Sequence, residues 1–407
     1  MSKFYHVIVV GAGPAGIMAA ITAAKNRKRV LIIDHNDKIA KKIYATGNGR
    51  CNFTNEYMDK ECFHGDEELI SNMLTQFSLQ DCLYFFHGIG ILPKSKNGYV
   101  YPNSEQASSV AIAFEKELCS LGVDIGLMAG VNGIEKRKNA FYLDIDQEEY
   151  RCDRLIIATG LKAAPKLGSD GSFLNMIKNL GHSFQPIMPA LCGFYCSGMN
   201  FKKMAKVRQE GLLSLYIENE FVMSDFGEIQ FTDYGLSGIP MFQLSALASK
   251  ALAAKKKVEV EINLLPNFDK EEFLTEMHYR ALLKGEDTLI GDIWNGLLVD
   301  KLCEPFISGT GIEKSVPVVK QKDVFEKLYE NICKRRVLVE KPRDYEFAQI
   351  CTGGIRTEEI NKKSLESLFV PGLYFAGELL DVDGICGGYN LQWAFSTGYT
   401  AGEFASR

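Results

Sequence analysis

The chain has 407 residues, of which 46% are hydrophobic and 24% are charged, a composition typical of globular proteins with two or three domains. Its formal net charge of −5 gives it no overall attraction to phosphate backbones, although basic patches can still exist locally. The 11 cysteines lack any CxxC spacing and the six histidines are scattered, so no zinc site, iron–sulfur cluster or disulfide framework is indicated. We expect a cytoplasmic protein, because many thiols without a secretion signal favour a reducing compartment.

A dinucleotide-binding pattern opens the chain. Residues 6–10, "HVIVV", predict a buried parallel strand, and "GAGPAG" follows with glycines at 11, 13 and 16. A predicted helix and a second strand, "RVLIID", lead to Asp34. In this context the glycines permit a tight turn, a close approach to a pyrophosphate and close helix packing, while Asp34 can accept hydrogen bonds from a ribose. The apolar run 7–24 is not read as a membrane span, since its Gly-x-Gly-Pro would break a helix.

Three later segments favour FAD over a nicotinamide cofactor. A strand ends in "ATG" within 154–160, another precedes the acids of 372–384, and a glycine turn enters a helix in 384–402. This combination is typical of flavoproteins of the glutathione-reductase structural class, in which the end of the chain returns to cover the flavin. No second G-x-G-x-x-G follows the "ATG" strand. We therefore predict FAD as the cofactor, with NAD(P)H docking transiently as the electron donor or with another donor in its place.

The order of motifs resembles that of the BaiN/RdsA family of bacterial FAD-dependent oxidoreductases. The shared stretches include "KKIYATGNGRCNFTN", "GYVYPNSEQASSV", "GEIQFTDYGLSGIP" and "PGLYFAGELLDVDGICGGYNLQWAFSTGYTAG". The resemblance runs over nearly the whole chain, and the "GRCN" and "GGYNLQWA" motifs are specific to it. Ala40 and Asn48 stand where the family usually has glycine.

The predicted fold is α/β, with a doubly wound, Rossmann-like FAD domain made of residues 1–190 and 341–407. Short apolar or alternating runs within 191–275 predict antiparallel strands that form a barrel-like insert. Residues 276–340 are predicted to be helical, with carboxylates near helix starts and Lys/Arg near helix ends. The resemblance implies the same two inserts, which commonly form a roof over a flavin. Within the β-rich insert, Tyr234 either faces a pocket or belongs to an ordinary turn.

The loop "YATGNGRCNFTN" at 44–55 combines a flexible backbone with three specific side chains. Its glycines allow backbone N–H groups to approach a cofactor. Arg50 can pair with phosphate or reduced flavin, and Asn52 can read a ring edge. Cys51 is either a proton donor acidified by its surroundings or simply a small buried residue.

The motifs and the resemblance together imply a set of cofactor-binding and catalytic residues. The catalytic candidates are Tyr389 and Cys51, of which Tyr389 is favoured because an unperturbed tyrosine stays protonated at pH 7. No metal ligand is predicted. The predicted FAD-binding residues are Gly11, Gly13, Pro14, Ala15, Gly16, Asp34, His35, Lys42, Gly47, Asn48, Gly49, Arg50, Asn52, Val131, Ala158, Thr159, Gly160, Gly377, Glu378, Asp383, Gly388, Asn390 and Leu391.

The resemblance implies three kinds of reaction. They are reduction of an activated C=C bond in 3-oxo steroids of bile-acid type, reduction of a uridine in ribosomal RNA, and amine oxidation. We favour the first, on a small hydrophobic enone, because the acidic net charge argues against an RNA substrate. Basic stretches at 201–208 and 333–336 keep uridine reduction as the alternative. A flavoprotein that only binds or carries electrons ranks last, and the oligomeric state is left open.

Overall fold

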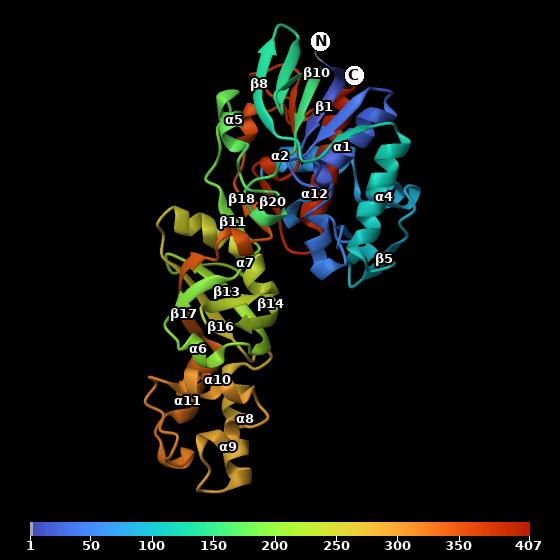
Figure 1. Cartoon of the computed structure of the whole chain (residues 1–407). Helices are drawn as coiled ribbons and strands as arrows, with labels where there is room; N and C mark the ends of the chain where they lie inside the picture. Colours follow the sequence, from blue (N-terminus) through green and yellow to red (C-terminus); the bar gives the residue numbers. More distant parts are fainter. Residues whose placement is uncertain (1–2) are drawn as a thin grey trace. The chain divides into compact units, whose positions relative to one another are not determined.

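The computed structural model describes residues 3–407 and divides into two compact units. One unit comprises Met1–Ile187 and Gln349–Arg407, and the other comprises Met188–Ala348. We call them the first unit and the inserted unit, and describe each by itself (Figure 1).

A seven-stranded sheet forms the centre of the first unit. Its order is β7-β2-β1-β10-β9-β8, and β19 also pairs with β10. The strands β7, β2, β1, β10 and β19 are parallel, while β9 and β8 extend the sheet in antiparallel fashion. Parallel strands covered on both faces are apolar throughout, as β2 is. The bounds are β1 (Lys3–Val10), β2 (Val30–Ile33), β7 (Asp124–Gly126), β8 (Val131–Arg137), β9 (Ala140–Ile145), β10 (Glu148–Ile157) and β19 (Leu373–Phe375).

Helices α1 and α12 pack side by side against this sheet (Figure 1). A Cβ on Gly402 of α12 would lie 2.5 Å from the carbonyl oxygen of Ala19 in α1, so only glycine allows this approach. The remaining elements complete the layers. The bounds are α1 (Pro14–Lys25), α2 (Glu67–Gln76), α3 (Leu79–Gly88), α4 (Ala107–Ser120), α5 (Leu174–Asn179), α12 (Tyr389–Ala405), β3 (Thr54–Asn55), β4 (Phe63–Gly65), β5 (Pro93–Lys96), β6 (Tyr99–Pro102), β18 (Ile350–Thr352) and β20 (Val382–Gly384).

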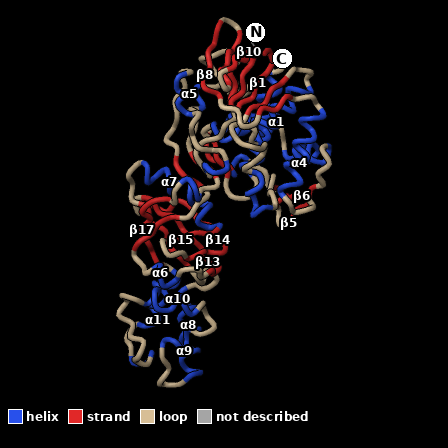
Figure 2. The backbone as a smooth tube through the Cα atoms, in the orientation of Figure 1, coloured by secondary structure: helices blue, strands red, loops and turns tan. Residues whose placement is uncertain are grey.

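The inserted unit contains a closed six-stranded barrel of order β12-β15-β14-β13-β16-β17. In β16 every second residue is buried, which is the period expected when one strand face lines a core. Figure 2 shows the barrel strands grouped together, with α8 to α11 forming the helical part of the same unit. The bounds are β11 (Met188–Ala190), β12 (Phe194–Ser197), α6 (Phe201–Met204), β13 (Arg208–Ile217), β14 (Glu220–Phe231), β15 (Gly235–Gly238), α7 (Ile239–Ala253), β16 (Val258–Asn263), α8 (Lys270–Lys284), α9 (Ile290–Trp294), α10 (Asp300–Ile307), α11 (Val324–Cys333) and β17 (Arg335–Pro342).

The predicted fold class is confirmed, whereas two details inside the inserted unit differ from the prediction. The range 276–340 was expected to be helical, but its last residues begin β17, whose pairing with β12 and β16 closes the barrel. Helix α8 begins at Lys270, before the expected boundary, because Asp269 and Glu272 form a capping box there. No helix within residues 3–407 is long and apolar enough to span a membrane.

Candidate active site

The glycine loop between β1 and α1 leaves room for a ligand at one position. A Cβ on Gly11 would lie 2.5 Å from the carbonyl oxygen of Ala158, and one on Gly16 would collide with the carbonyl oxygen of Gly11. Both glycines are therefore required by the packing of the chain itself. A Cβ on Gly13 would meet no atom within 4 Å, and its φ of −79° suits any residue. The free space beside Gly13 lies where the second glycine of this motif allows the backbone to approach a pyrophosphate.

The start of α1 is arranged to bind an anion. No side chain in the described part of the chain caps this helix, and Pro14 occupies its first turn. Asp34 accepts a 2.7 Å hydrogen bond from the N–H of Ala12 through Oδ2, and two more from Asn36 through Oδ1. An ionised carboxylate has about four lone-pair sites, so Asp34 stabilises the loop and retains capacity to accept from a ribose.

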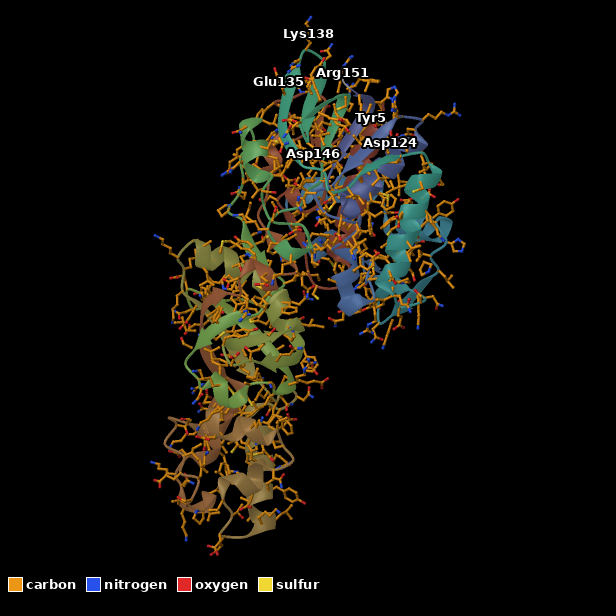
Figure 3. All side chains as sticks on the ribbon, viewed as in Figure 1. Tyr5, Asp124, Glu135, Lys138, Asp146 and Arg151 are labelled. Carbon is orange, nitrogen blue, oxygen red and sulfur yellow. The ribbon has the colours of Figure 1, made fainter. Side chains whose placement is uncertain are left out.

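Several predicted site residues from later motifs lie at the carboxyl ends of the parallel strands. Ala158, Thr159 and Gly160 follow β10, and Gly377 follows β19. His35 is exposed after β2, whereas Val131 is the first residue of β8 and does not follow the carboxyl end of a strand. By contrast, Tyr5 and Asp124 in Figure 3 lie near the amino ends of β1 and β7, away from the glycine loop. Ligands of open α/β sheets bind outside the carboxyl ends, which agrees with this distribution.

The loop at 43–52 adopts unusual backbone angles. Gly47 and Asn48 both have left-handed φ, of 56° and 54°. Ala40 also has a left-handed φ, of 55°. The left-handed region favours glycine, so Ala40 and Asn48 adopt a backbone conformation that is uncommon for residues with a side chain. Arg50 is exposed, and its guanidinium carbon lies 6.0 Å from the ring centre of Tyr101.

Cys51 was predicted to be either a proton donor or a small buried residue, and the structure supports the second interpretation. The residue is 0% exposed, so it has no surface from which to protonate a substrate. Burial raises the pKa of its thiol to about 12, and the Thr46 hydroxyl beside it lowers that pKa only in part.

We predict that Cys51→Ala leaves turnover within about twofold of wild type while lowering the free energy of unfolding by about 1–2 kcal/mol, as removal of a small buried group does. Steady-state rates and chemical denaturation of the holoenzyme measure the two quantities. A loss of turnover with unchanged stability would restore the catalytic role.

Two buried polar atoms near these loops have no partner. The side-chain oxygens Asn52 Oδ1 and Thr159 Oγ1 are buried and form no hydrogen bond within residues 3–407. Asn52 Oδ1 lies close to Gly388, where a Cβ would stand 2.9 Å from it. Buried polar groups in native proteins are nearly always hydrogen-bonded. Both oxygens belong to motifs predicted to bind the cofactor, so a bound cofactor that donates hydrogen bonds to them would satisfy them.

The turn before α12 presents backbone N–H groups. Gly388 begins the helix with a φ of 98°, and no side chain of residues 3–407 caps this end. Asn390 holds the turn, since its amide accepts from the N–H of Gly384 at 2.8 Å and donates to the same residue's carbonyl at 2.7 Å. Leu391 follows in the first turn and is half-buried. A free helix N-terminus stabilises negative charge.

Tyr389 does not have the surroundings of a proton donor. It is 5% exposed, its ring packs edge-on against Phe63, and its hydroxyl donates to the carbonyl of Tyr57 at 3.1 Å. Burial, followed by the neighbouring Cys62, raises its pKa. The structure thus commits this hydroxyl to the protein interior, and the predicted catalytic role of Tyr389 is not supported.

Asp383 was predicted to bind the cofactor, but its carboxylate is already occupied. The residue is 2% exposed. Its Oδ1 accepts from the hydroxyl of Thr352 at 2.5 Å, and its Oδ2 lies 2.8 Å from Nδ1 of His64 across the β4–β20 pair. Asp383 therefore links β20 to its neighbours.

Lys42 and Glu378, both predicted to bind the cofactor, form an ion pair of 3.1 Å with each other. Glu378 also accepts a hydrogen bond from the N–H of Cys351.

Tyr101 on β6 is a residue for which the sequence suggested no role. Its ring lies 3.5 Å from the position of a Cβ on Gly47, and its environment includes Arg50 and Cys386. Within residues 3–407 its hydroxyl forms no hydrogen bond, and burial raises its pKa above the usual value while Arg50 acts in the opposite sense. The residue is half-buried, so it is partly accessible, and its raised pKa keeps the hydroxyl protonated. Its motif "GYVYPN" contains two tyrosines, and the sequence alone does not distinguish their roles.

Two curated enzymes are similar in sequence to this chain over nearly its whole length. The 3-dehydro-bile acid delta(4,6)-reductase of Clostridium scindens is 38% identical over 402 residues, covering 98% of each chain. The ribosomal RNA dihydrouridine synthase of Escherichia coli is 29% identical over 406 residues, covering 98% of this chain and 97% of that one.

The structural comparison supports the fold alone. The 3-ketosteroid delta1-dehydrogenase from Sterolibacterium denitrificans, solved with 1,4-androstadiene-3,17-dione, aligns over the whole of both chains with a TM-score of 0.51 and 13% identity. A family model described as the HI0933-like protein Rossmann domain matches residues 5–404. The chain therefore belongs to the HI0933-like family of BaiN/RdsA-type FAD-dependent oxidoreductases.

Proposed function

We propose that the protein is an FAD-dependent reductase that transfers hydride to the activated C=C bond of an enone, a 3-oxo-Δ4 or Δ6 steroid of bile-acid type, with NAD(P)H as the donor. The observation that carries this proposal is the 38% identity, over nearly the full length of both chains, to a bile-acid delta(4,6)-reductase. Bound FAD supplies the hydride chemistry, and the chain positions and tunes it.

The residues described above fit the cofactor. The free space at Gly13 and the uncapped start of α1 would hold the pyrophosphate, and Asp34 would accept from the adenosine ribose. Asn52 Oδ1 would accept a ring N–H, and the start of α12 would stabilise negative charge on the reduced ring.

We propose Tyr101 as the proton donor to the α carbon of the substrate. It replaces Tyr389 and Cys51 in this role because its hydroxyl is unpaired and the residue is half-buried rather than enclosed. Its raised pKa keeps the proton in place at neutral pH, as a general acid requires.

We expect heat-denatured protein to release FAD and no FMN, because the glycine loop and Asp34 are arranged for an adenosine diphosphate. Chromatography of the released cofactor measures this. FMN at full occupancy would contradict the cofactor assignment.

The activity itself is tested by anaerobic half-reactions. NADH or NADPH should bleach the flavin, and a 3-oxo-Δ4 steroid should then restore its colour. Uridine reduction is the second candidate, favoured by the 29% identity to a ribosomal RNA dihydrouridine synthase. Reoxidation by unmodified ribosomal RNA, with no response to the steroid, would replace the first proposal by the second.

A further inference from the structure

An arginine in the inserted unit is surrounded by three aromatic rings. Arg343 follows β17, and its guanidinium carbon lies 3.8 Å from the ring centre of Phe347, 4.4 Å from that of Tyr234 and 5.5 Å from that of Tyr195. Tyr195 belongs to β12 and Tyr234 to the turn between β14 and β15. We call these four residues the Arg343 cluster.

The charge of Arg343 is not neutralised by any carboxylate of residues 3–407. Its Nη1 donates to the Tyr195 hydroxyl at 3.3 Å, while its Nε is buried and has no hydrogen-bond partner. Of the other barrel arginines, Arg208 pairs with Glu228, whereas Arg335 has no carboxylate partner within residues 3–407 and donates to the Asn331 side chain and the Gly198 carbonyl. Arg336 stacks on Tyr216 at 3.7 Å and also contacts Glu261 at 3.2 Å. An arginine with aromatic contacts alone therefore stands out within this unit.

The backbone around the cluster is built to hold it. The N–H of Arg343 donates to the carbonyl of Gly193 at 2.9 Å. A Cβ on Gly193 would lie 3.0 Å from the Tyr234 hydroxyl and 2.9 Å from the carbonyl oxygen of Leu236, so this position needs a glycine for Tyr234 to lie where it does. Lys341 adds a second cation, with its ammonium 4.7 Å from the Tyr195 ring.

We propose that the Arg343 cluster binds the carboxylate of an amphipathic acid, a steroid with an anionic side chain. A guanidinium fork pairs with a carboxylate through two parallel hydrogen bonds, and the rings offer a flat apolar surface beside it. Phe347 is 53% exposed and supplies part of that surface. The identification of this acid with the enzyme's substrate rests on the proposed function, whereas the binding itself does not.

A phosphate backbone is the competing source of an oxyanion. Arginine with aromatic rings can also stack on RNA bases. Binding along a phosphate chain needs many cations, however, and the cluster with Lys341 offers two. A single small anion therefore fits better.

The test is calorimetric titration of oxidised holoenzyme, which needs no turnover. The probes are 3-oxo-4-cholenoic acid, its methyl ester and a single-stranded ribosomal RNA fragment. We expect the acid to bind about 10- to 100-fold more tightly than the ester, as one or two charge-assisted hydrogen bonds provide. Arg343→Gln should reduce acid binding to the level of the ester, and Arg343→Lys should fall between, because it keeps charge without the planar fork.

Arg336→Gln is the matched control, since it removes the same charge from the same strand region but from an arginine that has a carboxylate partner. It should leave the affinity for the acid unchanged, and thermal unfolding should show all variants folded. Equal binding of acid and ester by wild type, equal loss of both in Arg343→Gln, or loss of RNA binding alone would each overturn the proposal. Failure of the holoenzyme to reduce any enone would instead contradict the proposed function. The titration would still decide whether the Arg343 cluster binds the carboxylate.

Discussion

Gly13→Val should give a folded protein that no longer retains FAD. The backbone at Gly13 is extended, with φ −79° and ψ −179°, and a Cβ there meets no protein atom within 4 Å. Valine therefore fits the protein alone, but its methyl groups fill the space proposed for the pyrophosphate. Loss of two hydrogen bonds to a charged group, each about 1.5–3 kcal/mol, corresponds to a loss of affinity of about 100-fold or more.

Flavin absorbance after gel filtration measures retention, and circular dichroism checks the fold. Gly88→Val at the end of α3 is the control, because a Cβ there also meets no atom within 4 Å. It should keep its flavin. If Gly13→Val remains as yellow as wild type, the pyrophosphate does not lie at this loop.

Tyr101→Phe should slow reoxidation of the reduced enzyme by an enone by about 10²–10⁴-fold, the usual loss on removal of a general acid. Reduction by NAD(P)H should be unaffected, since that step needs no proton from this hydroxyl. Burial raises the pKa of Tyr101, so its proton-donating form persists above the ordinary value of about 10. The wild-type rate should accordingly show no titration of this group between pH 6 and about 9.

Stopped-flow absorbance separates the two half-reactions. Tyr389→Phe is the competing variant, and we expect it to cost about 1 kcal/mol of stability by removing the hydrogen bond to Tyr57, with little change in rate. If Tyr389→Phe slows the enone step and Tyr101→Phe does not, the proton comes from Tyr389 after all.

The sequence predicted the parts of the site that depend on local backbone chemistry. The spacing of Gly11, Gly13 and Gly16 predicted a loop whose first and third glycines are required by contacts within the chain. Asn52 was assigned from its motif alone, and its unpaired oxygen now gives that assignment physical support.

The roles of Tyr389, Cys51 and Asp383 could not be predicted in the same way. Each belongs to a motif expected at the flavin, but its function depends on which side of the motif it faces. Tyr389 faces Tyr57 and Phe63, contacts made by residues more than 300 positions earlier. Spacing within a motif contains no information about such distant partners. Strand β17 was missed for a related reason, because its strand character depends on barrel pairing.

The pairing of β12 with β17 affects how the inserted unit can change during evolution. These are the first and last strands of the barrel, and Phe194 pairs with Pro342. The two ends of the inserted unit therefore emerge together, so the rest of the chain is interrupted as if by one short loop. Folding of the barrel itself offsets the entropic cost of bringing these two ends together. Modules whose ends lie close together tolerate insertion and exchange. Evolution can thus alter the unit that carries the Arg343 cluster without rebuilding the glycine loop.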